Sequence, residues 1–420
     1  MNTRSLKAAQ IIKCINASIS CIASSVLMAM ILTERTRSGL ASPYSRIIFA
    51  LSIADILFSF TTLISPFASA KENPDALFAI GSFKSCEAIG FVHIVAITCL
   101  VYYTVFLTYY FLKRIKYKMT PRDFAQKEEK FFHVVFIVIA CSLAIFSLVS
   151  ESINPLINGS ICSIGGSYPE GCGLSVESPL CERGSPNKTK LLTLIGGIIL
   201  GSAFLALVVI LYLFTRHVYQ QERELEIPAR GIGRQTTRRH HSNEDHQEDI
   251  PGPDDESEQK EKNNFVLTKQ AFYQSLLYVS SFLLVYLPMM IAMMQNVSGQ
   301  NASDSEWRFW LDTIIPLGGV FNILIYTRPK VLKLQEQFPM LMKWELFLIV
   351  LMKGGETPSM ADVRAAMDLA NAEMIQEQGF EEDHHEQRES NLLSYDLDVS
   401  RESEFISSVY QTRSSFWMRG

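Results

Sequence analysis

Charged residues are missing from long stretches of this 420-residue chain. No Asp, Glu, Lys or Arg lies between Glu87 and Lys113, and a helix of this length can cross about 30 Å of hydrocarbon. Elsewhere charge is crowded, so the formal net charge of −5 sums a basic set beside the apolar runs with an acidic loop and tail. This segregation is typical of a protein that crosses a membrane several times, and we expect no nucleic-acid partner.

Seven apolar runs follow one another along the chain. They cover roughly Ala8–Leu32, Tyr44–Ser69, Cys86–Lys118, Phe131–Ser150, Leu191–Thr215, Ala271–Met294 and Phe309–Tyr326. The first run is too long for the apolar part of a signal peptide and has no clear cleavage site, so we interpret it as a signal anchor. The sequence predicts an all-α membrane protein, with a short extracellular N-terminus over residues 1–8 and a bundle of seven transmembrane helices over residues 9–328.

Two independent patterns indicate which side of the membrane each loop faces. Lys and Arg gather after the first, third, fifth and seventh runs, and such residues are retained in the cytoplasm. Acceptors for N-linked glycans fall in the loops that this charge rule places outside, at Asn158, Asn187, Asn296 and Asn301, while a further match, Asn16, lies inside the first run. We therefore expect a multi-pass protein of the plasma membrane with its N-terminus outside and its C-terminus in the cytoplasm.

Three segments lie outside the predicted bundle on the cytoplasmic side. Residues 218–264 turn from basic to strongly acidic, so we expect a disordered loop in which Thr237 and Ser242 are either phosphorylation sites or chance matches. Residues 329–353 are predicted to form an interfacial amphipathic helix. Residues 354–420 are predicted to form a disordered cytoplasmic tail with one short helix near residues 359–376.

Several missing features narrow the function. No apolar run contains His-Glu-x-x-His or two Asp residues, and His93 and His133 stand alone in separate runs, so we expect no enzyme and no metal centre. It has no internal repeat, which weakens the alternative of a transporter or channel. That alternative also requires ionisable residues along a path, and Asp55 alone lies centrally in a run.

Short motifs in three of the runs match one family. The second run contains LSIADILFSF with Asp55, the seventh contains PLGGVFNILIYTRPK with Asn322 and Tyr326, and the sixth contains Tyr286-Leu287-Pro288. In these motifs, and in its orientation, the chain resembles the seven-helix G-protein-coupled receptors over roughly residues 8–334. It resembles a divergent member with rhodopsin-like and cyclic-AMP-receptor-like features.

The resemblance implies a switch with a polar core. Asp55 is costly in lipid and must find polar partners such as Asn322 or a bound cation, for which a sodium ion is the candidate. Pro288 removes a backbone hydrogen bond and bends the sixth helix, while Tyr286 stands where the family has tryptophan and is either part of the switch or a packed aromatic. No lysine lies between Phe309 and Tyr326, which argues against a retinal protein.

The sequence also departs from the family. The Asp/Glu-Arg-Tyr triplet at the inner end of the third helix is missing, and Tyr109-Tyr110-Phe111-Leu112 stand there instead. Ile323 replaces the proline of the seventh-helix motif, the fourth run lacks tryptophan and the fifth lacks proline. In the family, the arginine of the triplet restrains the sixth helix at rest. The nearest cations here are Lys113 and Arg114, which we expect to face the G protein.

Four cysteines fall at or beyond the outer ends of the runs, where the compartment is oxidising: Cys86, Cys162, Cys172 and Cys181. The resemblance implies that Cys86 pairs with a cysteine of the loop after the fourth helix. We favour Cys162, which leaves Cys172 and Cys181 as a local bridge, although the sequence leaves this connectivity open.

The resemblance further implies a ligand site at the outer mouth. His93 lies two helical turns inward from Cys86, where the family often places a ligand contact, and Glu151 and Asp312 lie near the same opening. Packing of His93 against other helices is an equal alternative. The predicted function is a cell-surface receptor that couples an unidentified extracellular ligand to a heterotrimeric G protein. Membrane lipid, a kinase and an arrestin-type tail binder are further candidate partners.

Overall fold

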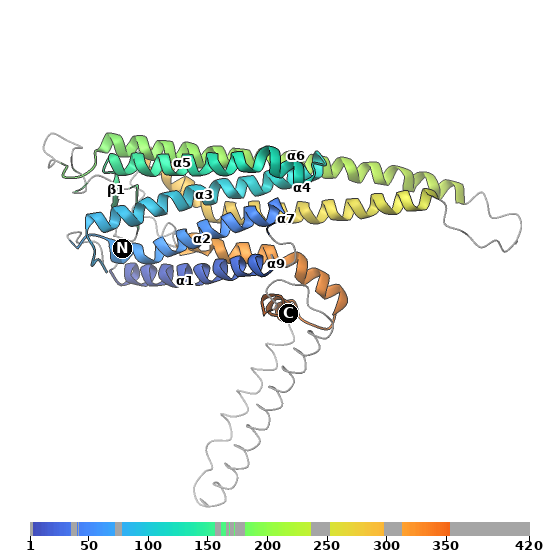
Figure 1. Ribbon diagram of the computed structural model, residues 1–420, viewed down its shortest axis with the longest axis horizontal. Coiled ribbons are helices and arrows are strands. Elements are labelled where there is room, and N and C mark those ends of the chain that lie inside the picture. Colours follow the sequence, from blue (N-terminus) through green and yellow to red (C-terminus); the bar gives the residue numbers. More distant parts are fainter. Residues whose placement is uncertain are drawn as a thin grey trace, which may run out of the picture. The chain divides into compact units, whose positions relative to one another are not determined.

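A computed structural model describes residues 3–34, 40, 42–71, 78–155, 161–164, 168, 172, 181–236, 253–297 and 313–352. The elements, in chain order, are α1 (Thr3–Glu34), α2 (Pro43–Ala68), α3 (Phe83–Lys116), α4 (Pro121–Phe124), the π-helical turn η2 (Ala125–Glu129), α5 (Lys130–Val149), β1 (Ile153–Pro155), β2 (Cys162–Ile164), α6 (Pro186–Thr236), α7 (Pro253–Val297), the 3-10 turn η5 (Ile315–Leu317), α9 (Gly318–Gln337) and α10 (Lys343–Met352). Long helices lie side by side in a bundle (Figure 1).

Six helices of the described ranges are long and apolar enough to cross a membrane. They lie in α1, α2, α3, α4 to α5, α6 and α7. The seventh predicted span is described from Thr313 onward. It consists of η5 and α9, which contact α1, α2 and α7. The prediction of a seven-helix membrane bundle is thereby confirmed.

Helix α3 is the central element of the bundle. It packs against α2, α5, α6 and α7 and carries β1 and β2 at its outer end. Its apolar side chains therefore face protein, and Phe106 and Leu107 are almost fully buried. The outer helices instead expose large apolar side chains, such as Ile22 on α1 and Leu205 on α6, each more than 60% exposed. A surface of this kind suits contact with lipid tails.

Side-chain caps set where three of the helices begin. The hydroxyl of Ser42 accepts a hydrogen bond from the Ser45 amide at 3.2 Å, directly before α2, and the hydroxyl of Thr120 accepts one from the Asp123 amide at 3.1 Å, before α4. Before α3, Ser82 and Ser85 form a reciprocal capping box. Each cap satisfies an amide that has no partner within its helix.

Two glycines permit close approaches that position the rest of the bundle. On α9, a Cβ at Gly319 would collide with Ser20 and Ser24 of α1, and the Gly319 amide donates to the Ser20 hydroxyl at 3.0 Å. On α3, a Cβ at Gly90 would collide with Ile153 of β1, so the hairpin lies directly on the helix. Helix α9 is therefore fixed to α1, and the β-hairpin to α3.

The segment between the fifth and sixth predicted spans differs from its prediction. Within residues 218–264, expected to be disordered, α6 continues to Thr236 and α7 already begins at Pro253. The charged flanks are rich in Gln, Glu, Lys and Arg, which are strong helix formers, so the helices of the apolar runs propagate into these flanks. The candidate phosphorylation sites Thr237 and Ser242 lie outside the described residues.

The two ends of the predicted bundle also need correction. Helix α1 begins at Thr3, so residues 3–8 of the predicted N-terminal segment belong to the first helix. The predicted interfacial helix over 329–353 is divided, because α9 runs through Pro329 to Gln337 and α10 starts only at Lys343. Within α10, Leu346 and Val350 are buried against the bundle while Trp344 is 58% exposed. The predicted tail over residues 354–420, with its helix near 359–376, lies outside the described residues.

Candidate functional site

The centre of the bundle holds a buried carboxylate. Asp55 of α2 is 3% exposed, and the side-chain amide of Asn322 on α9 donates a hydrogen bond to it. Helix α9 comes close here because Gly318 has no side chain; a Cβ at that position would lie 3.4 Å from Asp55 Oδ1. The structure thus brings together two of the residues predicted to form the polar core, and it links α2 to α9 through them.

A hydroxyl lies one helical turn outward from this carboxylate. Ser59 of α2 is 1% exposed, and its Oγ has no hydrogen-bond partner among the described residues. Such a group is costly to bury without a partner. A carboxylate and a hydroxyl on one helix face are oxygen donors of the kind that hard cations prefer, so Asp55 and Ser59 fit a small cation.

The remaining residues of the predicted switch lie in two other places. Tyr286 of α7 is 7% exposed and packs on Phe282 at 4.7 Å between ring centroids, in an apolar cluster shared with α3 and α6. Pro288 lies inside α7, between Tyr286 and Met289 of this cluster. Tyr326 of α9 is 5% exposed and lies in the larger core, among aromatic side chains of other helices. The burial of Tyr286 and its contact with Phe282 match the packed-aromatic alternative, and its part in a switch stays a prediction.

The two cations predicted to face the G protein have different surroundings. Lys113 donates to Glu128 at 2.8 Å and lies over the ring of Tyr109, so its charge is already paired. Arg114 is exposed, and its guanidinium donates to the Met119 carbonyl at 2.9 Å across the turn that ends α3. Of the two, Arg114 is the one that faces outward.

A buried ion pair at the inner end was missed at the level of sequence. Arg46 of α2 donates from Nε and from a terminal nitrogen to the two oxygens of Glu129, each at 2.6 Å. His133 of α5 lies 3.7 Å from the same carboxylate, and its other ring nitrogen is 2.8 Å from the Tyr103 hydroxyl of α3. This polar chain joins α2, η2, α5 and α3. Arg46 and Glu129 are 83 residues apart in the sequence, so no local motif could have revealed their ion pair.

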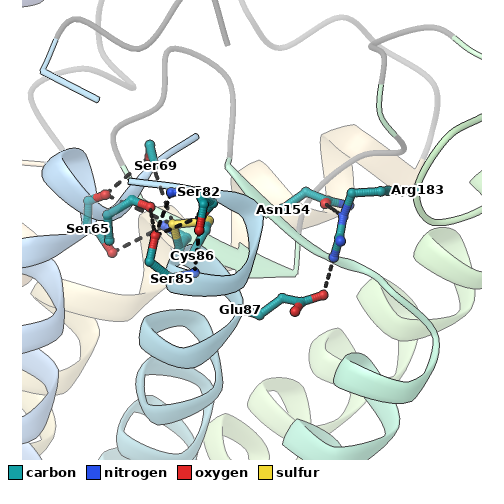
Figure 2. Close-up of a disulfide and its surroundings, with 10 residues drawn as sticks. Ser65, Ser69, Ser82, Ser85, Cys86, Glu87, Asn154 and Arg183 are labelled. Carbon is teal, nitrogen blue, oxygen red and sulfur yellow. Dashed lines mark hydrogen bonds and ion pairs between the residues drawn. A yellow bond between two sulfur atoms is a disulfide. The ribbon is translucent and has the colours of Figure 1, made fainter. Parts of the chain in front are cut away.

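The outer end of α3 is tied to the β-hairpin (Figure 2). Cys86 forms a disulfide with Cys162 of β2, and Cys172 forms one with Cys181, which is the pairing that we favoured. Next to the first bridge, Arg183 pairs with Glu87 and donates to Asn154 Oδ1 at 3.2 Å. β1 and β2 pair antiparallel, with Ile153 opposite Ile164.

Of the three residues proposed for ligand contact, the structure describes His93 and Glu151. His93 is 3% exposed, with its Nδ1 3.1 Å from the Thr61 hydroxyl of α2 and its ring 5.0 Å from that of Phe58, which matches the packing alternative. Glu151 is exposed in a turn with φ of 53°. Asp312 lies outside the described residues. Lys13 of α1 is only 5% exposed and is a further ionisable residue of the first span, which no sequence motif marks.

The candidate glycosylation sites are described only in part. Asn187 is exposed in the first turn of α6, at the same end of the bundle as the two disulfides. Asn296 lies in the last turn of α7, with its side chain outside the described residues, and Asn158 and Asn301 are also outside them. Glycosylation at these positions stays a prediction.

Taken together, a membrane bundle with a buried Asp–Asn contact and a disulfide from α3 to an outer hairpin defines a seven-helix membrane receptor. The family of 7 transmembrane receptors (rhodopsin family) matches residues 24–325, and the chain belongs to this family. It is therefore a G-protein-coupled receptor by family and not an enzyme. The fold is similar to that of squid rhodopsin, with a TM-score of 0.57 and 15% identity over 86% of this chain and 94% of that chain. No protein with a curated description matches the sequence.

Proposed function

We propose that this receptor binds an extracellular ligand and activates a heterotrimeric G protein in the cytoplasm. The observation that carries the proposal is the contact between Asp55 and Asn322, because it couples α2 to α9 at the buried centre of the bundle. A polar contact without water around it holds two helices in one arrangement, and a change in that arrangement can reach both ends of the bundle. Pro288 supplies a bend in α7, and Arg114 offers an exposed charge at the inner end.

The proposed orientation places the disulfide-bonded end outside the cell. Both disulfides lie at one end of the bundle, and disulfides persist in oxidising compartments. The opposite end of α3 carries Lys113, Arg114 and Lys116 in its last turn, as expected for a cytoplasmic end. We place the receptor in the plasma membrane on this basis. The kinase and arrestin-type partners stay predictions, because the tail lies outside the described residues.

A ligand screen with a G-protein dissociation readout tests the proposal. Membranes that express the chain are exposed to a compound library in the presence of a panel of heterotrimers, and currents are recorded in parallel. We expect at least one compound to dissociate one heterotrimer. The variant Asp55→Asn keeps a hydrogen-bonding side chain but removes the charge, and we expect it to lower the response at equal surface expression. Ligand-evoked current without any G-protein response would instead favour a channel.

We also propose that a sodium ion binds at Asp55. The carboxylate and the partnerless hydroxyl of Ser59 are the residues that would hold it, and the bound ion would offset the cost of a buried charge. A ligand that binds only the folded state raises the unfolding temperature. We therefore expect NaCl at about 150 mM, close to physiological ionic strength, to raise the unfolding temperature. The same concentration of N-methylglucamine chloride should raise it less. Equal effects of both salts, or an undiminished sodium effect in Asp55→Asn, would contradict the site.

A further inference from the structure

The ring of Tyr44 lies at the meeting point of the inner helix ends. Tyr44 belongs to the first turn of α2. Its centroid is 6.4 Å from that of Tyr110 and 5.7 Å from that of Phe111, both on α3. On the other side, the ring is stacked on Tyr326 of α9, with 6.2 Å between centroids and only 7° between the planes. One side chain therefore contacts α3 and α9 at once.

A hydrogen bond adds α7 to this cluster. The side-chain amide of Gln274 donates to the Tyr44 hydroxyl at 2.9 Å. Tyr110, Phe111 and Tyr326 are each less than 10% exposed, while Tyr44 and Gln274 are partly buried. Aromatic pairs at such separations stabilise beyond the area that they bury, and a hydrogen bond that is partly shielded from water is stronger than a fully exposed one. Tyr44 thus links α2 to three helices at their inner ends.

This cluster occupies the place where the family has its arginine. Tyr110 and Phe111 are buried within the stretch that replaces the Asp/Glu-Arg-Tyr triplet. The nearest cations on α3 are engaged elsewhere, since Lys113 pairs with Glu128 and Arg114 binds the Met119 carbonyl. Tyr44 of α2 therefore bridges α3 to the inner parts of α7 and α9 through stacked rings and one neutral hydrogen bond.

We propose that Tyr44 holds the resting state closed by joining the inner ends of α3, α7 and α9. The inference rests on the proposed signalling function, but it concerns how the closed state is maintained. Opening the inner end for a transducer requires α7 or α9 to move away from α3, and either movement separates the Tyr44 ring from one of its partners. Removing the ring therefore shifts the closed–open equilibrium towards the open state without any ligand.

The test compares two readouts on the full-length receptor in nanodiscs. The first is ligand-independent nucleotide exchange on a panel of heterotrimers, and the second is amide hydrogen exchange in residues 268–282 of α7 and 318–337 of α9. We expect Tyr44→Ala to raise basal nucleotide exchange by about fivefold and to speed hydrogen exchange in both segments. Tyr44→Phe retains the ring and should stay close to the wild type. Gln274→Leu removes the hydrogen bond alone and should give a smaller rise in the same direction, even if Tyr44→Ala fails to fold.

The matched control is Tyr212→Ala, which removes a ring that is 61% exposed on α6. It should change neither readout. Unchanged hydrogen exchange in Tyr44→Ala, or an equal increase in Tyr212→Ala, would overturn the inference. Faster hydrogen exchange with no response from any heterotrimer would support the role of Tyr44 in closure and would count against G-protein coupling, so the two proposals fail separately.

Discussion

The outer and inner ends of this bundle are held together by different chemistry. At the outer end, a disulfide joins α3 to β2, and Arg183 joins Glu87 to Asn154 beside it. At the inner end, no cysteine bridge is present among the described residues, and the helices are joined by aromatic rings and ion pairs around Tyr44 and Glu129. A covalent bridge keeps one distance under all native conditions, whereas stacked rings can separate and return. The difference indicates that the outer end is the fixed frame and that the inner end can open.

Breaking the covalent frame should have the largest effect. Cys86→Ser opens a loop of 76 residues, for which chain entropy predicts a loss of about 4 kcal/mol in the free energy of unfolding. Cys172→Ser opens a separation of 9 residues and should cost about 2–3 kcal/mol. Denaturation of the two variants in detergent measures both losses of the free energy of unfolding. Peptide mapping without reductant provides a check, since recovery of Cys86 as a free thiol in folded wild-type protein would contradict the bridge.

Breaking the buried ion pair tests the inner end. Glu129→Gln keeps the shape of the side chain but removes the negative charge that pairs with Arg46, and we expect a loss of about 3 kcal/mol in the free energy of unfolding. The carboxylate side chain is 5% exposed and the guanidinium 32%, so solvent compensates only in part. The control is Glu222→Gln, which breaks an exposed pair with Lys269 and should cost less than about 0.5 kcal/mol. Similar losses in both variants would show that Glu129 contributes no more than a surface charge.

The buried side chain of His93 should contribute to the stability of the fold through its packing. His93→Ala removes the contacts with Thr61 and Phe58 and should lower the free energy of unfolding by about 2 kcal/mol. Because the ring is buried against α2, we expect the potency of an agonist found by screening to stay unchanged. His93→Gln offers a control that restores part of the volume and a hydrogen bond. A loss of potency at unchanged stability would return His93 to the ligand site.

The smallest expected effect concerns the exposed charge of the inner end. Arg114→Ala removes a guanidinium whose bond to Met119 is exposed, so the fold and surface expression should be retained. Agonist-evoked nucleotide exchange should fall by roughly threefold, because an exposed charge at an interface mainly affects association. Lys127→Ala is a control, since Lys127 is also an exposed cation of the same basic stretch. An equal fall in both variants would assign the effect to general charge and anionic lipid, not to Arg114.

The sequence predicted the features that depend on composition and on short motifs. Runs without charge identified the membrane helices, because lipid excludes unpaired charge over the whole length of a span. Asp55 and Asn322 were expected to meet, since their motifs carry a resemblance to a known family, and the structure brings them into contact. The same resemblance suggested the pairing of Cys86, which the residues alone left open.

The features that the sequence did not predict depend on contacts between distant residues or on helix propagation. Arg46 lies at the start of the second apolar run, and only the fold shows that Glu129 is its partner. Tyr44 looked like the first aromatic of a span, and its contacts with α3 and α9 come from packing. The extensions of α6 and α7 were missed because a charged segment with few apolar residues reads as disordered, although its residues favour helix.

The contact of Gly319 with Ser20 gives α9 a pivot. At this point the two helix backbones lie too close to slide past one another, so α9 can tilt about Gly319 more easily than it can shift along α1. Residues 319 to 326 form a lever arm of about 10 Å at about 1.5 Å per residue. A tilt of about 10° would move Tyr326 by roughly 2 Å while the outer start of α9 stays in place. A small angular displacement would thus become a separation of the stacked rings at the end of the bundle opposite the disulfides.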